Sequence, residues 1–184
     1  ELIEYYKGIF TTLSSCASRQ LEEVTFRRAT ISVPELMATA GKYFRKVYKG
    51  NKAHIDFKIQ PLEGRITGDW NQLRFLLENL IDEACSVTLD GAVCLSARED
   101  GEFIRFLFTD MRREKTREEL NQLFYPDLSR MTAGEKGELY GTEYLVCKQI
   151  IRDHDEFAGR RGCRINAEPG KEGGFTIYFT LPKK

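Results

Sequence analysis

The chain has 184 residues, enough for one domain with a well-buried core. Its 28 basic and 28 acidic residues cancel, and no basic run carries interleaved aromatics, which argues against a nucleic-acid partner. No apolar run approaches the roughly 18 residues of a membrane span, so we expect no membrane contact by this segment. The sequence begins at Glu1 rather than at Met, which indicates a piece excised from a longer protein.

The cysteines and histidines of the sequence indicate where the protein is located and whether it binds zinc. Five cysteines occur without any Cys-x-x-Cys pair, mostly inside apolar segments, which predicts reduced thiols and a cytoplasmic location. That location fits either a free protein or the cytoplasmic part of a larger membrane-anchored one. Because His54 and His154 each lack a second ligand at metal spacing, we expect no zinc site.

Residues 2 to about 25 predict one long helix. Apolar residues from Leu2 to Cys16 step by four and three, as in a coiled-coil seam, so we expect a homodimer through this helix. The next helix starts clearly at Ser32, which predicts an N-cap completed by Glu35 in a capping box, with Pro34 in the first turn. It should run to about Tyr48.

The rest of the chain alternates strands and helices. Alternating residues predict strands, with Asp100-Gly101 as a hairpin turn between two of them. The expected strands cover residues 53–59, 65–67, 92–97, 103–109, 163–167 and 175–181. Helices are expected after an Asp69 cap, within the charged segment 112–121 toward Phe124, and over 143–154, with a loop over 129–141. This order predicts an α+β sandwich.

The helix over residues 70–85 carries a polar stripe beside its apolar face. Asn79, Asp82, Glu83 and Ser86 follow helical spacing and therefore share one side. An amide and two carboxylates on one side could line a metal or nucleotide pocket, or could form a solvated face. This feature alone leaves both interpretations open.

Several motifs then occur in a family's order. Asn79 to Cys85 resembles an asparagine box, Phe108-Thr109-Asp110 a strand end with an adenine-binding aspartate, and Leu123 to Pro126 a phenylalanine box. The segment from Lys148 to Pro182, with Glu168-Pro169-Gly170-Lys171, resembles the family's ending. From about residue 31 the chain thus resembles the ATP-binding domain of sensor histidine kinases, in the GHKL superfamily.

The resemblance implies a two-layer α/β sandwich with a mixed, mostly antiparallel sheet and helices on one face. It divides the chain into residues 1–30, resembling the end of a dimerisation helical hairpin, and residues 31–184, the ATPase-like domain. It implies ATP and Mg²⁺ as cofactors, with Asn79 and Glu83 at the metal. The nucleotide-site positions that it assigns, altered or vestigial, are Asn79, Glu83, Ser86, Asp110, Arg112, Gly141, Glu143, Lys148 and Gly174.

Many of these positions depart from the family pattern. Glu83 replaces the metal-ligating asparagine and Ser86 a basic residue, and Asp110 is followed by Met111-Arg112-Arg113-Glu114 instead of the glycine motif. In the second glycine loop only Gly141 remains. Glu143 puts a carboxylate in the first turn of a helix, where a triphosphate would bind and be repelled. Gly174 stands where a hydroxyl residue assists the aspartate.

The departures lead to a hypothesis of a self-filled pocket, in which Arg112 or Arg113 pairs with Asp110 in the adenine position. No residue receives a catalytic role: Lys148 and His154 are interpreted as surface and helix-end residues, and His54 as ordinary. Neither histidine follows the phosphoacceptor pattern, which is a histidine followed by an acidic residue on a dimerisation helix. We therefore predict a pseudokinase signalling module, more consistent with no bound cofactor, that docks a signalling protein.

Two alternatives stay open. One is a divergent but active histidine kinase domain in which Asn79, Glu83 and Asp110 hold magnesium-ATP in an altered pocket. The other, more distant, is a non-kinase GHKL ATPase of the chaperone-like or anti-sigma type.

Overall fold

The computed structural model describes residues 3, 25–125, 132–133, 139–140 and 143–184. The long helix expected over residues 2 to about 25 and most of the expected loop over 129–141 lie outside these residues. The elements are β1 (Ala29–Ser32), α2 (Val33–Val47), β2 (Ile55–Gln60), β3 (Arg65–Gly68), α3 (Trp70–Cys85), β4 (Gly91–Asp100), β5 (Phe103–Asp110), α4 (Arg117–Gln122), β6 (Thr132–Ala133), β7 (Leu139–Tyr140), α5 (Glu143–Phe157), β8 (Ile165–Pro169) and β9 (Phe175–Pro182).

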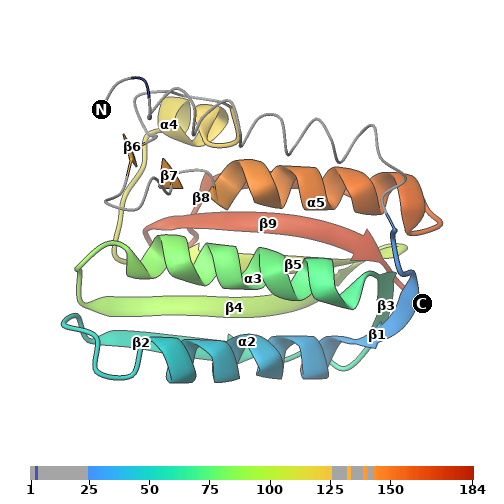
Figure 1. Ribbon diagram of the computed structural model, residues 1–184, viewed down its shortest axis with the longest axis horizontal. Helices are drawn as coiled ribbons and strands as arrows, with labels where there is room; N and C mark the ends of the chain where they lie inside the picture. Colours follow the sequence, from blue (N-terminus) through green and yellow to red (C-terminus); the bar gives the residue numbers. More distant parts are fainter. Residues whose placement is uncertain (1–2, 4–24, 126–131, 134–138, 141–142) are drawn as a thin grey trace.

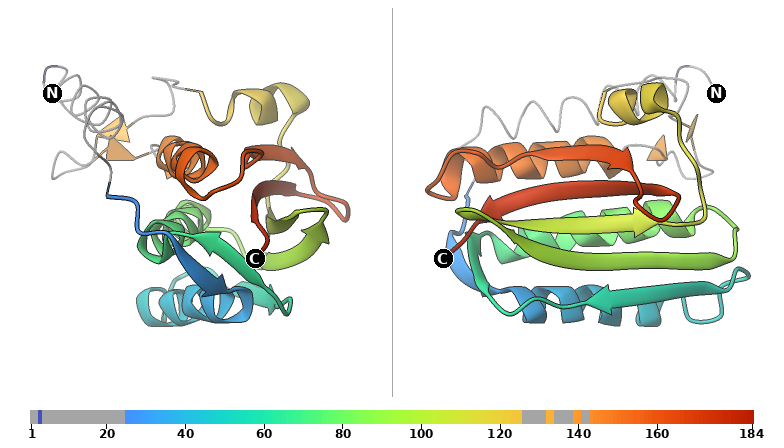
Figure 2. Two further views of the ribbon diagram at one scale, coloured as in Figure 1. Left: turned by 90° about the vertical axis from the view of Figure 1, so that its right-hand side faces the viewer. Right: turned by 180° about the vertical axis from the view of Figure 1, so that it is seen from behind.

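A five-stranded sheet and a layer of helices form the domain. The strand order is β2-β4-β5-β9-β8, with β2 and β4 parallel and the remaining pairs antiparallel. Helices α2, α3 and α5 all lie on one face of this sheet (Figures 1 and 2). The predicted two-layer α+β sandwich with a mixed, mostly antiparallel sheet is thereby confirmed.

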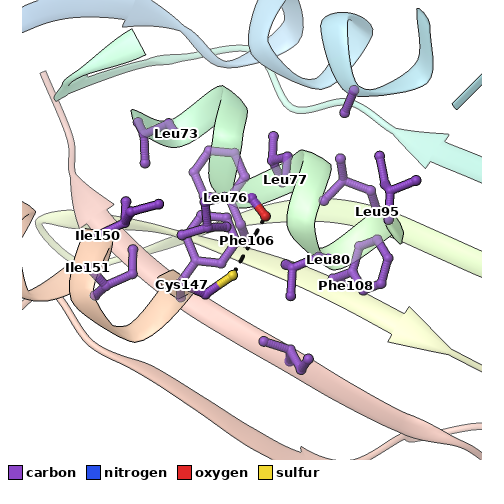
Figure 3. Close-up of a cluster of buried hydrophobic side chains, with 14 of the residues drawn as sticks. Leu73, Leu76, Leu77, Leu80, Leu95, Phe106, Phe108, Cys147, Ile150 and Ile151 are labelled. Atoms are coloured by element: carbon purple, nitrogen blue, oxygen red, sulfur yellow. Dashed lines mark hydrogen bonds between the residues drawn. The ribbon is translucent and has the colours of Figure 1, made fainter. Parts of the chain in front are cut away.

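The core lies between α3, α5 and the central strands. Figure 3 shows leucines of α3 gathered with isoleucines of α5 and with Leu95, Phe106 and Phe108 of β4 and β5. The Cys147 thiol donates to the Leu76 carbonyl across the two helices at 3.7 Å. Apolar burial of this kind is the main force that holds the layers together.

The starts of α2 and α3 follow the sequence prediction closely. Ser32 caps α2 by accepting from the Glu35 N–H at 3.4 Å, the forward half of the expected capping box. Asp69 caps α3 by accepting from the Gln72 N–H at 3.1 Å. These caps satisfy N–H groups that have no partner inside the helix.

Several elements differ from the predicted bounds, and β1, α4 and β8 are the most informative of them. Strand β1 was not foreseen: Ala29–Ser32 pairs with β3, so Ala29 and Thr30, assigned above to the N-terminal helical part, lie in a strand. The charged segment becomes helical only at Arg117, because Thr116 forms a capping box with Glu119. Strand β8 starts at Ile165, because the N–H groups of Gly162 and Cys163 bind the Asp155 carboxylate.

Within the described residues, none of the helices has both the length and the apolar character that crossing a bilayer would require.

Candidate functional site

Asp110 ends strand β5 and is the centre of the site. Its side chain is 1% exposed, and both carboxylate oxygens accept from arginines. Oδ1 accepts from the Arg112 N–H at 3.0 Å and from Arg112 Nε at 2.9 Å. Oδ2 accepts from Arg112 Nη2 at 2.8 Å and from Arg113 Nε at 2.9 Å. Because a carboxylate offers about four lone-pair sites, Asp110 is saturated. The predicted pairing of Asp110 with an arginine is confirmed, and both arginines take part.

Arg112 uses its whole guanidinium inside the protein. Besides its two side-chain bonds to Asp110, Nη2 donates to the Ala84 carbonyl at 2.6 Å, and Nη1 donates to the carbonyls of Leu89 and Val87 at 2.9 and 3.3 Å. All five guanidinium N–H groups therefore have acceptors. Ala84 lies in the last turn of α3, so Arg112 also caps that helix and matches the negative end of its dipole.

The electrostatics of Asp110 follow from these contacts. Burial by itself would raise the pKa of Asp110, but the hydrogen bonds from Arg112 and the charges of Arg113 and Arg112 outweigh it. The pKa of Asp110 is therefore held below its usual value. The carboxylate stays ionised, as the buried ion pair requires.

Arg113 connects Asp110 to Glu83 on α3. Its Nη1 and Nη2 donate to the two Glu83 oxygens at 2.9 and 2.8 Å, a bidentate pair whose side chains are 13% and 15% exposed. The guanidinium also lies over the Phe175 ring, 5.2 Å from its centroid, and Lys115 Nζ lies 5.1 Å from the same centroid. Burial by itself would lower the pKa of Arg113, but the hydrogen bond and the charge of Glu83 outweigh burial and raise this pKa above its usual value.

The predicted polar stripe of α3 divides in two. Asp82 turns toward α2 and accepts from the hydroxyls of Tyr43 and Tyr48 at 2.7 and 2.6 Å. Asn79 donates to the Phe75 carbonyl of its own helix at 2.7 Å, and Ser86 donates to the Glu83 carbonyl at 2.6 Å. Of these four residues, only the Glu83 carboxylate joins the arginine cluster. No group of three or more acidic, histidine or cysteine residues suited to a metal occurs in the described part of the chain.

Gly174 is required by a close backbone approach. It adopts φ +69°, and a Cβ at this position would lie 2.0 Å from the Asp110 carbonyl oxygen. Its N–H donates to Glu114 Oε1 at 2.8 Å, so the arginine-bearing segment is tied to the start of β9. A glycine here serves the contact between β5 and β9.

The remaining predicted site residues border this cluster less directly. Lys148 Nζ lies 3.5 Å from the Phe124 carbonyl oxygen and 4.6 Å from the centroid of the Tyr125 ring. Glu143 begins α5. Gly141 lies outside the described residues.

The prediction that His154 is a surface residue is wrong. This histidine belongs to the last turn of α5 but is not a surface residue, since its side chain is fully buried. Nε2 accepts from the Asp69 N–H at 3.0 Å, and Nδ1 lies 2.8 Å from the Ile150 carbonyl oxygen. Burial lowers the pKa of His154 to about 4, against the opposing effect of the Ile150 hydrogen bond. The helical spacing of Cys147, Ile150, Ile151 and His154 was the signal that places it on the core face.

Residues 68–184 match the family of histidine kinase-, DNA gyrase B-, and HSP90-like ATPases. The chain belongs to this ATPase family. It is 26% identical over 177 residues to the adaptive-response sensory kinase SasA of Thermosynechococcus vestitus, covering 95% of this chain and 44% of that relative. The chain thus spans less than half of the length of that relative.

Solved structures of histidine kinases share the fold. The nucleotide-free catalytic domain of histidine kinase ThkA matches with a TM-score of 0.65 and 19% identity, over 85% of this chain and 96% of that one. The structure of ThkA in complex with the response regulator protein TrrA matches with a TM-score of 0.64 and 16% identity, over 97% of this chain and 49% of that one.

As arranged, this member of the ATPase family does not fit the nucleotide chemistry that the resemblance implies. An adenine amino group needs a free acceptor on Asp110, and both oxygens already hold arginine N–H groups. A magnesium ion at Glu83 would compete with the bidentate Arg113. Sequence reasoning anticipated the arginines but missed the Phe175 ring beneath Arg113 and the α3 carbonyls around Arg112, because these depend on tertiary placement.

Proposed function

We propose that this chain is a signal-transduction module that retains the histidine kinase ATPase fold and acts through protein interaction, with little or no ATP turnover. The observation that carries the proposal is the saturation of Asp110 by Arg112 and Arg113. Displacing the Arg112 guanidinium would remove two of the four hydrogen bonds to a carboxylate that is 1% exposed, and it would also remove a donor from each of the Ala84, Val87 and Leu89 carbonyls. Buried groups that lose hydrogen-bond partners in this way raise the free energy of the protein. This cost opposes the binding of any ligand that must displace Arg112.

The proposed partners are proteins. ThkA, which shares the fold, has been crystallised with a response regulator protein, and this supports a protein partner from a signalling pathway for the present chain. We also propose a cytoplasmic location and a homodimer through the helix predicted within residues 1–30.

The alternative is a divergent but active ATP-binding domain of a two-component sensor histidine kinase. Membership of the ATPase family favours it. It requires Arg112 and Arg113 to leave Asp110 and Glu83, so that the carboxylates become available to adenine and magnesium.

Calorimetric titration with ATP, with and without Mg²⁺, separates the two functions. A ligand at 100 times its Kd adds about 2.7 kcal/mol of stability, which raises the Tm of a domain of this size by roughly 5–10 °C. We expect no binding heat and no Tm shift at millimolar ATP. Micromolar binding would overturn the proposal.

A matched variant sharpens this test. Arg112→Gly together with Glu114→Gly restores the spaced glycines after Asp110 and removes the guanidinium. Once circular dichroism has shown that the variant is folded, ATP binding by it and not by the natural chain would assign the block to the side chains of Arg112 and Glu114. Tight binding by both would support the active kinase domain.

A further inference from the structure

Strand β2 is one edge of the five-stranded sheet. It pairs with β4 alone among the described strands, and Figure 2 shows it as the last strand on its side. The opposite edge, β8, is shorter, ends at Pro169 and lies beside α4. A cavity of about 450 Å³ opens next to the start of β2, and it is lined by Phe44 of α2, Tyr48, Gly50, Asn51 and residues 53–56. An edge that is neither short, bulged nor covered is a template for pairing with another strand.

The register with β4 tells which backbone groups of β2 face outward. Gly91 N–H donates to the His54 carbonyl at 3.1 Å, and Ile55 pairs with Gly91 in a parallel ladder. In such a ladder, alternate residues bond to the neighbouring strand. The even-numbered residues of β2 therefore bond to β4, and Ile55, Phe57 and Ile59 direct one N–H and one C=O each toward the free edge.

A second copy of β2 would satisfy all of these groups. In an antiparallel pair with its two-fold axis at Phe57, each Phe57 exchanges two hydrogen bonds with its counterpart, and each Ile55 does so with the partner's Ile59. The three residues that the ladder with β4 leaves unused are thus the three that this arrangement bonds. The half-buried side chains of Ile55, Phe57 and Ile59 would lie on the helix-covered face of both copies.

The charges on the opposite face select the same register. Asp56 and Lys58 are 64% and 59% exposed on their side chains, and only a 3.4 Å ion pair within one strand joins them. Around a two-fold axis at Phe57, Asp56 of each copy faces Lys58 of the other, in the non-hydrogen-bonded pair where side chains come closest. A lone edge lysine would block strand pairing, but the adjacent aspartate makes this strand complementary to itself.

We propose that the edge strand β2 is a homotypic docking site, where two copies of this chain join their sheets through antiparallel Ile55–Ile59 segments. The occupant is a second copy because the alternation of Asp56 and Lys58 is self-complementary about Phe57. This interface is separate from the helix predicted within residues 1–30 and does not depend on whether ATP binds.

Amide hydrogen exchange of the whole chain, followed by NMR at several protein concentrations, measures directly whether the outward-facing amides of β2 are hydrogen-bonded. The amides of Asp56 and Lys58 should be protected at every concentration, because β4 binds them. The amides of Ile55, Phe57 and Ile59 should gain at least tenfold protection as the concentration rises from micromolar to millimolar. Fast exchange of these three at all concentrations, or protection that does not change with concentration, would overturn the proposal.

Charge reversal tests the register and the identity of the occupant. Asp56→Lys puts four positive charges around the axis and Lys58→Glu four negative ones, so each variant should self-associate roughly tenfold more weakly. The double variant Asp56→Lys with Lys58→Glu restores opposite charges and should recover the protection.

Mixing the two single variants gives the sharpest readout. Each introduced charge then faces an opposite charge on the other chain, so the mixture should associate where neither variant does alone. The exposed, off-edge changes Glu63→Lys and Lys171→Glu alter the net charge equally and should leave the exchange pattern unchanged. Equal association of all variants, or no gain on mixing, would show that β2 does not dock a second copy in this register.

Discussion

The most informative residue is Arg112, whose guanidinium binds Asp110, the residue that the family resemblance assigns to adenine binding. It joins its near neighbour Asp110 at the end of β5 to Ala84 in the last turn of α3 and to Leu89 in the segment leading into β4, which lie 28 and 23 residues earlier in the chain. Gly91 packs against it, since a Cβ there would lie 2.8 Å from Arg112 Cγ. Arg112 has therefore become a structural residue of the domain.

Replacing Arg112 should destabilise the protein strongly. Arg112→Ala removes the main partner of a buried carboxylate, which typically costs about 3–5 kcal/mol. Urea denaturation at pH 7 would measure the loss. Arg98→Ala, at an exposed position on β4, is the matched control and should change stability by no more than about 0.5 kcal/mol.

Arg112→Lys distinguishes geometry from charge. A lysine keeps the positive charge but cannot supply the five fixed donors, so it should recover only part of the lost stability. Losses below about 1 kcal/mol in Arg112→Ala would contradict the structural role of the guanidinium.

His154 should make the stability of the protein depend on pH. Its pKa in the folded protein, about 4, lies below the ordinary value of 6.5, so the unfolded chain binds the extra proton between these values. The contribution of neutral His154 to the free energy of unfolding is therefore complete above about pH 6.5. It is lost as the pH falls toward 4, by about 3 kcal/mol in total.

Urea unfolding between pH 5 and 7 would measure this slope. His154→Gln can replace both hydrogen bonds but does not titrate, so its stability should fall less steeply with falling pH. The exposed His54→Gln should keep the steep slope of the natural chain. Parallel curves for the natural chain and His154→Gln would refute this assignment.

At the scale of elements, the contact between the ends of β5 and β9 has no room for a side chain. Gly174 and Gly101 have similar φ angles, +69° and +61°, but only at Gly174 would a Cβ meet backbone atoms, the nearest at 2.0 Å. Gly101→Ala should cost about 1–2 kcal/mol for the left-handed conformation alone. Gly174→Ala should lose roughly 1–3 kcal/mol more, because backbone packed against backbone cannot yield easily.

Thermal unfolding of both glycine variants separates the clash from the conformational cost. Equal losses would mean that the strand ends move apart without penalty. The Gly174 variant should also weaken the bond from its N–H to Glu114, visible as faster exchange of that amide.

The elements with strong periodicity or clear caps were predictable from the sequence. Ser32 and Asp69 mark helix starts because capping is a local interaction, and the hairpin at Gly101 has a local turn signal. Strand β1 was missed because its partner β3 lies more than thirty residues away and four residues carry little periodicity. Sequence separation, rather than chemistry, limited the prediction of elements.

For the candidate site, the types of residue were predictable from the sequence, but the directions of their side chains were not. The replacement of glycines by Arg112 and Glu114 is visible in the sequence and led to the expectation of a pair with Asp110. The opposite directions of Asp82 and Glu83, adjacent on α3, arise from tertiary partners: two tyrosines of α2 for one and Arg113 for the other. His154 was misplaced because a histidine near a helix end was taken as polar surface instead of as part of the apolar face.

At the scale of the whole molecule, the described residues before β1 contact the start of α3 and the end of α5. Phe26 packs edge-on against His154, with ring centroids 4.8 Å apart, and lies 5.8 Å from Phe157. The Arg27 N–H donates to Asp69 Oδ2 at 2.9 Å, on the same aspartate that caps α3. From these contacts we predict that the folded unit starts before β1.

Two truncated chains test this boundary. Residues 29–184 lack the Phe26 ring and the Arg27 bond that residues 25–184 keep. The aromatic contact is worth about 0.5–1.5 kcal/mol and a hydrogen bond to a carboxylate about 1.5–3 kcal/mol. A loss of roughly 2 kcal/mol lowers the Tm of a domain of this size by about 4–8 °C. Scanning calorimetry of the two chains would measure the difference.

Phe26→Ala within residues 25–184 divides the effect, since it removes the ring but keeps the Arg27 bond to Asp69. It should lower the Tm by less than the shorter truncation does. If residues 25–184 and 29–184 unfold at the same temperature, Phe26 and Arg27 only rest on the domain, and the folded unit begins at β1. A clear difference instead means that any displacement of the preceding chain acts directly on the cap of α3 and the buried histidine of α5.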